Sequence, residues 1–216
     1  MVLGIYGAGA LGREILEIVE EVNEVNFRWD RVVYLVDQSD EKEKNGLEVI
    51  SPETFAGYDM DKEVVIAVGE PFARWKMREK IQRMECKLAE PIIHPSCKVS
   101  RDATIQNGTV VSYGNCISFN SQIGENVYIQ PSGGIGHDAY IGDNSVISAG
   151  VRVAGHTKIG RNVYIGLMVP IRDRVSIGEG SIVSMGSVVQ RDIPENVIAM
   201  GNPARVIKPN VEHKLF

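Results

Sequence analysis

The chain is poor in the residues that mark several other protein classes. It has only 3 cysteines (Cys86, Cys97 and Cys116), an odd number without metal-ligand spacing. This excludes a disulfide-rich secreted scaffold and favours a reduced, cytoplasmic setting. No apolar run reaches the length that crosses a bilayer, so we expect neither a membrane span nor a membrane partner.

A surplus of positive charge is also missing. Lys and Arg total 23 against 28 Asp and Glu, which gives a net charge of −5. This balance disfavours a nucleic-acid partner, because binding to phosphates needs a basic surface. With 216 residues the chain is long enough for one or two domains with a real hydrophobic core.

What the chain does have is an aliphatic residue at every sixth position. The series runs without a break through Ile93, Val99, Ile105, Val111, Ile117, Ile123, Ile129, Ile135, Ile141, Ile147, Val153, Ile159, Ile165, Ile171, Ile177, Val183 and Val189. A spacing of six is neither the helical period nor a simple strand alternation. It predicts a solenoid of flat stretches and turns, in which each repeat contributes one core side chain.

The other repeat positions agree with this interpretation. Glycine often follows the aliphatic residue, as at Gly124, Gly136, Gly142, Gly160, Gly166 and Gly178, and we expect turns there that need unusual dihedral angles. A small or β-branched residue comes four positions after it. The resulting pattern, [Ile/Val]-Gly-x-x-[small]-x, resembles the hexapeptide-repeat acyltransferases. That resemblance implies a left-handed parallel β-helix of triangular section.

The first part of the chain follows a different pattern. Apolar strands are predicted at residues 2–6, 31–36 and 64–68, and helices at 13–25 and 71–85, with a charged loop at 38–45. This alternation predicts an α/β, Rossmann-like domain with three or four parallel strands. We therefore expect a Rossmann-like domain over residues 1–90 and a β-helix domain with a C-terminal cap over residues 91–216.

A glycine-rich turn joins the first strand to the first helix. Gly7, Gly9 and Gly12 fit the spacing of a dinucleotide-binding turn, and Asp37 ends the next strand. Three interpretations remain open: a nicotinamide cofactor, a nucleotide-sugar, and a purely structural turn. The domain is small and no redox residues follow the motif, so we favour the nucleotide-sugar.

The whole chain resembles the sugar acetyltransferase family of hexapeptide-repeat acyltransferases. This family includes bacterial UDP-amino-sugar N-acetyltransferases and the sialic acid O-acetyltransferases. The matching segments are Tyr6-Gly-Ala-Gly9, Leu35-Val-Asp37, Ala67-Val-Gly69, Ile93-His-Pro95, Gly136-His-Asp138, Ile141-Gly-Asp143 and Gly201-Asn-Pro-Ala-Arg205. Two departures leave the sugar and its nucleotide open: Ala10-Leu11 replaces a histidine that many relatives carry, and Gln130 replaces an asparagine.

The resemblance implies an enzyme that transfers an acetyl group from acetyl-CoA to a nucleotide-linked amino-sugar in surface glycan biosynthesis. The substrate would contact Gly7, Ala8, Gly9, Asp37, Gly69 and Gln130, and acetyl-CoA would contact Gly166, Leu167, Met185 and Gly186. It also implies a homotrimer with the active site at the subunit interface. We expect the outward residues Tyr128, Tyr140, Val146 and Tyr164 to form its flat apolar face. Two alternatives stay open: O-acetylation of a sialic acid or other sugar, and a non-catalytic nucleotide- or sugar-binding scaffold.

Only four histidines can supply a general base: His94, His137, His156 and His213. His137 followed by Asp138 matches the family's catalytic pair, in which the carboxylate orients the imidazole. We expect His94 to be structural and His213 to be exposed. Residues eighteen apart should stack on successive coils, so Asp138 should also face His156, whose role stays open between support and a solvated turn. A catalytic zinc site of three histidines is not expected, because His137 has no close histidine partner in the sequence.

Overall fold

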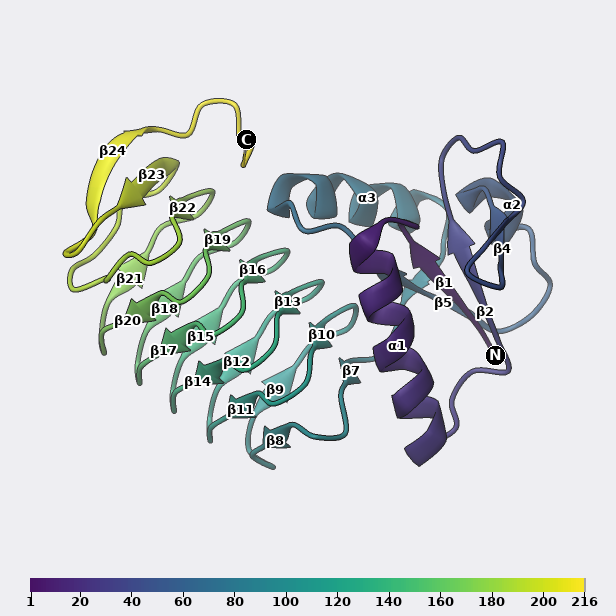
Figure 1. Ribbon diagram of the computed structural model, residues 1–216, viewed down its shortest axis with the longest axis horizontal. Helices are drawn as coiled ribbons and strands as arrows, with labels where there is room; N and C mark the ends of the chain where they lie inside the picture. Colours follow the sequence, from purple (N-terminus) through teal and green to yellow (C-terminus); the bar gives the residue numbers. More distant parts are fainter. Residues whose placement is uncertain (216) are drawn as a thin grey trace.

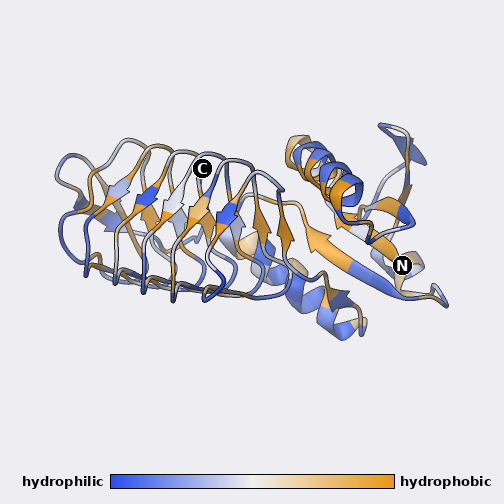
Figure 2. Cartoon of the chain, turned by 90° about the horizontal axis from the view of Figure 1, so that it is seen from below, coloured by the Kyte–Doolittle hydropathy of each residue, from blue (hydrophilic) through white to orange (hydrophobic). Residues whose placement is uncertain are grey.

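The computed structural model describes residues 1–215 and consists of two parts. An α/β domain at the N-terminal end is followed by a long triangular prism of stacked coils (Figure 1). Figure 2 shows the prism from below, with the α/β domain at one end of it. Within the described residues, no helix is both long and apolar enough to cross a membrane.

The N-terminal domain has a six-stranded sheet in the order β3-β4-β2-β1-β5-β6. Its strands are β1 Val2–Tyr6, β2 Arg31–Leu35, β3 Glu43–Lys44, β4 Leu47–Ile50, β5 Lys62–Ile66 and β6 Lys87–Leu88; its helices are α1 Ala10–Val25, α2 Pro52–Ala56 and α3 Pro71–Arg83. All neighbouring strands are parallel except β3 and β4. β3 lies in the segment expected to be a charged loop, and neither β4 nor β6 is predicted from the sequence. β3 and β6 have only two residues each, and β4, although mostly apolar, has only four, so these strands are too short to show the apolar pattern on which the prediction relied.

The rest of the chain winds as a left-handed parallel β-helix with three faces. The first face contains β7 Ile92–Ile93, β10 Val110–Val111, β13 Tyr128–Ile129, β16 Val146–Ile147, β19 Tyr164–Ile165, β22 Ile182–Val183, β23 Val197–Met200 and β24 Arg205–Pro209. The second contains β8 Lys98–Val99, β11 Cys116–Ile117, β14 Gly134–Ile135, β17 Arg152–Val153 and β20 Pro170–Ile171. The third contains β9 Thr104–Ile105, β12 Gln122–Ile123, β15 Tyr140–Ile141, β18 Lys158–Ile159 and β21 Ser176–Ile177.

The six-residue phase predicted from the sequence is confirmed. Each repeat strand ends with its aliphatic residue, and strands eighteen residues apart pair in parallel, as Ile123 does with Ile141 and Ile141 with Ile159. Both Ile141 and Ile159 are fully buried in the prism core. Burial of such a side chain contributes roughly 1.5–3 kcal/mol, so each fully buried repeat residue stabilises the prism.

The small residues of the repeat point inward at the turns. Thr109 and Ser145 are fully buried, and their hydroxyls each donate to the carbonyl of a glycine, Gly124 or Gly160, at 2.7 and 2.9 Å. Each hydroxyl also accepts a backbone N–H from the next coil. The buried polar groups therefore have partners and link successive coils.

The predicted reason for the repeat glycines is wrong. Gly136, Gly142 and Gly166 do not have positive φ angles; instead, a Cβ atom at any of them would lie 2.5–2.7 Å from backbone of the next coil. The positive φ angles fall two positions later, at non-glycine residues such as Asp138 and Asn144. The glycines are needed because neighbouring coils approach too closely for a side chain.

The turns form three edges of the prism. The first edge follows the first face and includes residues 112–115, 130–133, 148–151, 166–169 and 184–187. The second edge follows the second face and includes residues 118–121, 136–139, 154–157 and 172–175. The third edge follows the third face and includes residues 124–127 and 142–145.

The N-terminal domain covers part of the first face. Tyr128 and Val146 are fully buried in one hydrophobic cluster with residues of α1, including Ile15 and Ile18. Tyr140 instead lies on the third face and is exposed. The expectation that Tyr128, Tyr140, Val146 and Tyr164 form one subunit interface is therefore wrong, because a six-residue period does not show which face the other domain covers.

A buried arginine fixes the junction of the two parts at the third edge. The Arg74 guanidinium on α3 is fully buried and donates to the backbone oxygen of Asn126 at 2.8 Å and to its side-chain oxygen at 2.7 Å. It also donates to the carbonyls of Ile66 and Val68 at 2.9 Å. Burial lowers the pKa of Arg74 to about 9, which still leaves the group charged at neutral pH.

Candidate active site

His137 and Asp138 form a hydrogen-bonded pair on the second edge. The turn between β14 and β15 places Asp138 in the left-handed region, with φ 56°, and its Oδ2 lies 2.8 Å from His137 Nδ1. Asn120, one coil earlier, donates to Asp138 Oδ1 at 3.2 Å. The hydrogen bond from His137, with the second from Asn120, holds the pKa of the Asp138 carboxyl below its ordinary value. The carboxylate thus stays charged and accepts a hydrogen bond from the Nδ1–H of His137, which leaves the Nε2 lone pair of that tautomer free.

Neighbouring coils hold the His137 ring in place. The Phe119 ring stacks on it with centroids 5.2 Å apart and an interplanar angle of 9°. The His156 ring meets it edge-on at 5.0 Å. The His137 side chain remains 45% exposed, and its Nε2 has no hydrogen-bond partner within residues 1–215. The imidazole is therefore oriented by packing and yet open to a bound molecule.

The predicted stacking of Asp138 and His156 is confirmed. His156 Nδ1 lies 3.9 Å from Asp138 Oδ2, and the Asn120 contact continues the same column toward the earlier coil. Arg174, one coil further, instead lies 3.8 Å from Asp173. The column therefore gives Asp138 polar neighbours on both sides.

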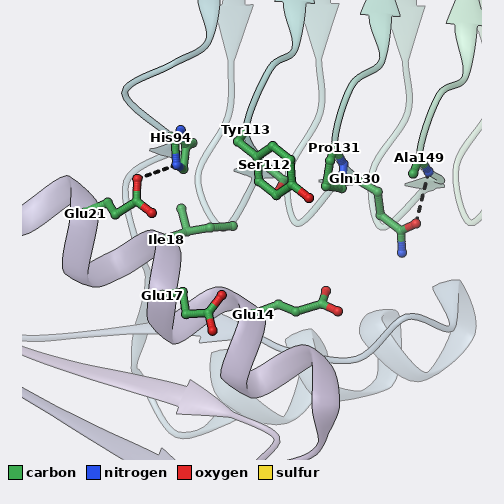
Figure 3. Close-up of a pocket in the computed structure, with 10 residues that line it drawn as sticks. All are labelled: Glu14, Glu17, Ile18, Glu21, His94, Ser112, Tyr113, Gln130, Pro131 and Ala149. Atoms are coloured by element: carbon green, nitrogen blue, oxygen red, sulfur yellow. Dashed lines mark hydrogen bonds and ion pairs between the residues drawn. The ribbon is translucent and has the colours of Figure 1, made fainter.

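A cavity of about 350 Å³ lies between α1 and the first edge (Figure 3). It is lined by Glu14, Glu17, Ile18, Glu21, His94, Ser112, Tyr113, Gln130, Pro131 and Ala149. The Gln130 side-chain oxygen accepts from the Ala149 N–H at 3.1 Å, and its amide nitrogen points away from the prism (Figure 3). His94 Nε2 lies 2.6 Å from Glu21, so His94 links the two parts of the chain at this cavity.

The first edge also carries the residues predicted to contact CoA. Leu167 and Met185 are stacked one coil apart, with exposed side chains. Gly186 has φ 68° and donates its N–H to the Leu167 carbonyl at 2.8 Å. At Gly166 a side chain would collide with the backbone of Met185. Leu167, Met185 and Gly186 thus form one exposed strip on the same edge as Gln130, whereas Gly166 is buried.

The glycine-rich turn precedes α1. Two of its glycines have no room for a side chain, and the third has open space around it. Gly7 has φ 120°, and a Cβ atom there would lie 2.7 Å from the Ala67 carbonyl oxygen. A Cβ atom at Gly12 would lie 2.2 Å from the Gly7 oxygen. Gly9 has open space around it and is the N-cap residue of α1, without a side-chain cap. The first N–H groups of α1 are therefore available to an anion such as a pyrophosphate, as at other helix N-termini.

Asp37 lies at the end of β2, near this turn, and contacts two groups that the sequence analysis missed. It accepts from the Tyr6 hydroxyl at 2.7 Å and lies 2.5 Å from Lys80 Nζ on α3. Burial alone would raise the pKa of Asp37, but the hydrogen bonds from Lys80 and Tyr6 lower it overall. Lys80 also lies 2.8 Å from Glu53. These contacts could not be predicted, because Lys80 is one of several charged residues in the polar helix α3 and nothing in the sequence distinguishes it.

The structure does not bring all the predicted site residues together within one chain. Gly7, Ala8, Gly9, Asp37 and Gly69 lie at the carboxyl ends of the strands of the N-terminal domain. Gln130 and the Leu167–Met185 strip lie on the first edge, whereas His137 and Asp138 lie on the second. The second face separates the two edges.

Three family models match the chain. They are the PglD N-terminal domain over residues 2–81, the bacterial transferase hexapeptide (six repeats) over residues 120–155, and the hexapeptide repeat of succinyl-transferase over residues 156–191. No curated protein sequence matches the chain significantly.

Solved structures of similar proteins cover nearly the whole chain. The acetyltransferase domain of PglB from Neisseria gonorrhoeae has a TM-score of 0.87 at 26% identity, over 95% of this chain and 99% of its own. WeeI from Acinetobacter baumannii has a TM-score of 0.87 at 27% identity, over 96% and 100%. PerB from Caulobacter crescentus, solved with CoA and GDP-perosamine, shares the fold with a TM-score of 0.82 at 24% identity, over 96% and 97%. The chain thus joins a PglD N-terminal domain to bacterial transferase hexapeptide repeats, and it is similar to solved acetyltransferase structures over nearly its whole length.

Proposed function

We propose that the protein transfers the acetyl group of acetyl-CoA to the amino group of a nucleotide-linked amino-sugar, in the biosynthesis of a surface glycan. The observation that carries this proposal is the His137–Asp138 pair, whose Nε2 is free on an exposed edge. The PglB acetyltransferase domain, which this chain resembles, has also been solved with acetyl coenzyme A.

In this proposal His137 acts as general base and then as general acid. The amine attacks the thioester carbonyl carbon while Nε2 accepts its proton, and Asp138 stabilises the resulting imidazolium. Collapse of the tetrahedral intermediate breaks the carbon–sulfur bond. The imidazolium then returns the proton to the departing CoA sulfur. No covalent acyl-enzyme and no metal cofactor are needed for this sequence.

Residues 1–90 would bind the nucleotide-sugar and residues 91–216 would carry acetyl transfer. The open Gly7–Gly9 turn and the α1 N-terminus suit the pyrophosphate, and Asp37 and Gly69 lie beside them. Gln130 would contact the sugar from the first edge. Gly166, Leu167, Met185 and Gly186 would contact CoA. Both substrates are cytoplasmic metabolites, so we place the reaction in the cytoplasm, where the free thiols Cys86, Cys97 and Cys116 stay reduced.

We further propose a homotrimer in which the second edge of one subunit lies beside the first edge of the next. His137 and the Leu167–Met185 strip lie on different edges of one chain, so a single chain does not assemble the complete site. A neighbouring copy would supply the missing edge. Light scattering should give three times the chain mass of 23.8 kDa at micromolar concentration. A monomer that turns over at full rate would contradict this arrangement.

A panel of acceptors tests the function directly. We expect release of free CoA thiol with nucleotide-linked amino-sugars, and not with the matching nucleotide-sugars that carry only hydroxyls. Acetylation of a sialic acid instead would establish the O-acetyltransferase alternative, and nucleotide binding without turnover on any acceptor would indicate a scaffold. Calorimetry should detect binding of CoA and not of NADH. NADH binding without CoA binding would instead favour the nicotinamide interpretation of the glycine-rich turn.

A further inference from the structure

The second edge brings together two histidines and one carboxylate from adjacent coils. His137, Asp138 and His156 each have a ligating atom within 4.8 Å of the other two. Asp138 Oδ2 is shared, because it lies 2.8 Å from His137 Nδ1 and 3.9 Å from His156 Nδ1. The three side chains thus surround one point on the surface of a rigid scaffold.

This donor set suits a borderline transition-metal ion. Two imidazole nitrogens and one carboxylate oxygen are common zinc ligands, with bonds of about 2.0–2.2 Å. In that geometry the ligand atoms on a zinc ion lie about 3.3 Å apart. Side-chain rotations that move the ligand atoms by about 1 Å would therefore bring all three within bonding distance of one ion. The His137, Asp138 and His156 side chains are 45%, 34% and 42% exposed, which leaves a path for a hydrated ion.

Nearby groups favour an ion of positive charge. Asp138 is the acidic member of the cluster. The side chain of Asn120 donates to its other oxygen, Oδ1, so Oδ2 can exchange its hydrogen bond with His137 for a bond to the ion. The nearest cation along the column, Arg174, is engaged with Asp173 at 3.8 Å. Phe119 covers one side of the His137 ring and restricts its orientation.

We propose that His137, Asp138 and His156 bind one divalent transition-metal ion such as Zn²⁺, and that the bound ion inhibits acetyl transfer. The inhibition, though not the binding, rests on the proposed function of His137. When His137 Nδ1 ligates the ion, the neutral ring carries its single proton on Nε2. Nε2 then has no lone pair for the acceptor's proton, and Asp138 no longer orients the ring. The ion also fills the space beside the base.

Metal binding is tested first, on the metal-free full-length protein and without substrates. Competition against a chromogenic zinc chelator should show one ion per chain, and Co²⁺ should give the visible absorption of a low-coordinate site. His156→Asn should weaken binding by at least about tenfold, which is 1.4 kcal/mol. His213→Asn is the matched control, because it removes a histidine that stacks on Phe72, outside the cluster. Equal affinities for the wild type and His156→Asn would overturn the site, as would the absence of binding.

Inhibition is then tested by measuring the acetylated product by chromatography, because the CoA thiol itself binds zinc. Each variant is compared with its own metal-free rate. Zn²⁺ should suppress the wild-type rate, excess chelator should restore it, and His156→Asn should need at least about tenfold more Zn²⁺ for the same suppression. Full turnover by the zinc-loaded wild type would overturn the inhibitory role. If zinc binds through these residues but no acceptor is acetylated, the site stands and the proposed function fails.

Discussion

Gly155 lies directly beside the imidazole of His137, one coil further along the second edge. A Cβ atom added at Gly155 would lie 2.7 Å from both Nε2 and Cε1 of the ring. The φ angle of Gly155 is not in the left-handed region, so the backbone itself accepts a side chain there. The glycine is needed for the position of the histidine and not for the turn.

Gly155→Ala should therefore impair catalysis while leaving the fold intact. The methyl group would displace the His137 ring, and a misplacement of about 1 Å costs on the order of 10²-fold in rate. The measurement is kcat together with the melting temperature. Gly57→Ala is the control, because its Cβ would make only an ordinary 3.4 Å contact with the Thr54 oxygen. Equal kcat values for the two variants would show that the ring tolerates the displacement.

Replacement of the base should affect the chemical step and spare substrate binding. His137→Ala should lower kcat by about 10²–10⁴-fold, the usual range for a general base, with CoA affinity nearly unchanged. Asp138→Asn should lower kcat by a smaller factor, because the base His137 remains although its orientation is lost. Steady-state kinetics with calorimetry of CoA binding separates these effects. If His156→Asn abolishes turnover while His137→Ala does not, the base is one coil further along.

The six-residue phase is tested by placing a charge in the prism core. Ile159→Asp puts a carboxylate without a partner in a fully buried position and should lower the free energy of unfolding by several kcal/mol. Lys158→Ala, on the exposed side of the same strand, should change it by less than about 0.5 kcal/mol. Urea denaturation followed by circular dichroism measures both. Similar midpoints for the two variants would contradict the assignment of inward and outward positions.

Arg74 should be the most sensitive charged residue in the chain. Arg74→Met leaves the buried Asn126 oxygens and the Ile66 and Val68 carbonyls without their donor, and breaking such a buried network costs about 3–5 kcal/mol. Arg83→Ala, at the exposed end of the same helix, should cost less than about 0.5 kcal/mol. Urea unfolding compares them. A small decrease in the free energy of unfolding for Arg74→Met would mean that the junction tolerates an apolar side chain at this position.

The ion pairs of Lys80 predict a dependence of stability on pH. The pKa values of Asp37 and Glu53 lie below their ordinary values of 3.8 and 4.5 in the folded chain. The stability that these carboxylates contribute is therefore present above those ordinary values and is lost as the pH falls through the lower, folded-state values. Lys80→Met should thus be less stable than the wild type at about pH 6, and the difference should shrink at about pH 3. A difference that does not change with pH would mean that Lys80 acts through packing alone.

The repeat could be predicted from the sequence because it depends only on the spacing of residues along the chain. Each aliphatic residue faces the same core, so one spacing places Ile141 and Ile159 without knowledge of the rest of the fold. The contact of Asp138 with His156 follows from the same spacing, whereas the pairing of His137 with Asp138 was expected from the family resemblance. The covered first face and the contacts of Arg74 and Lys80 could not be predicted, because they depend on how the N-terminal domain packs on the prism. The reason for a glycine at position 155 could not be predicted either, since only the three-dimensional structure shows which ring lies beside it.

Because the coils stack, the distance from the N-terminal domain to a turn of the prism can change only in steps of one coil. Parallel strands of neighbouring coils lie about 4.8 Å apart, so an insertion or deletion of eighteen residues shifts the His137 turn along the prism by that amount without changing the edge it occupies. Evolution of this architecture toward longer or shorter acceptors would therefore proceed in jumps of one whole coil. The loops and side chains of the N-terminal domain would have to supply every finer adjustment of reach.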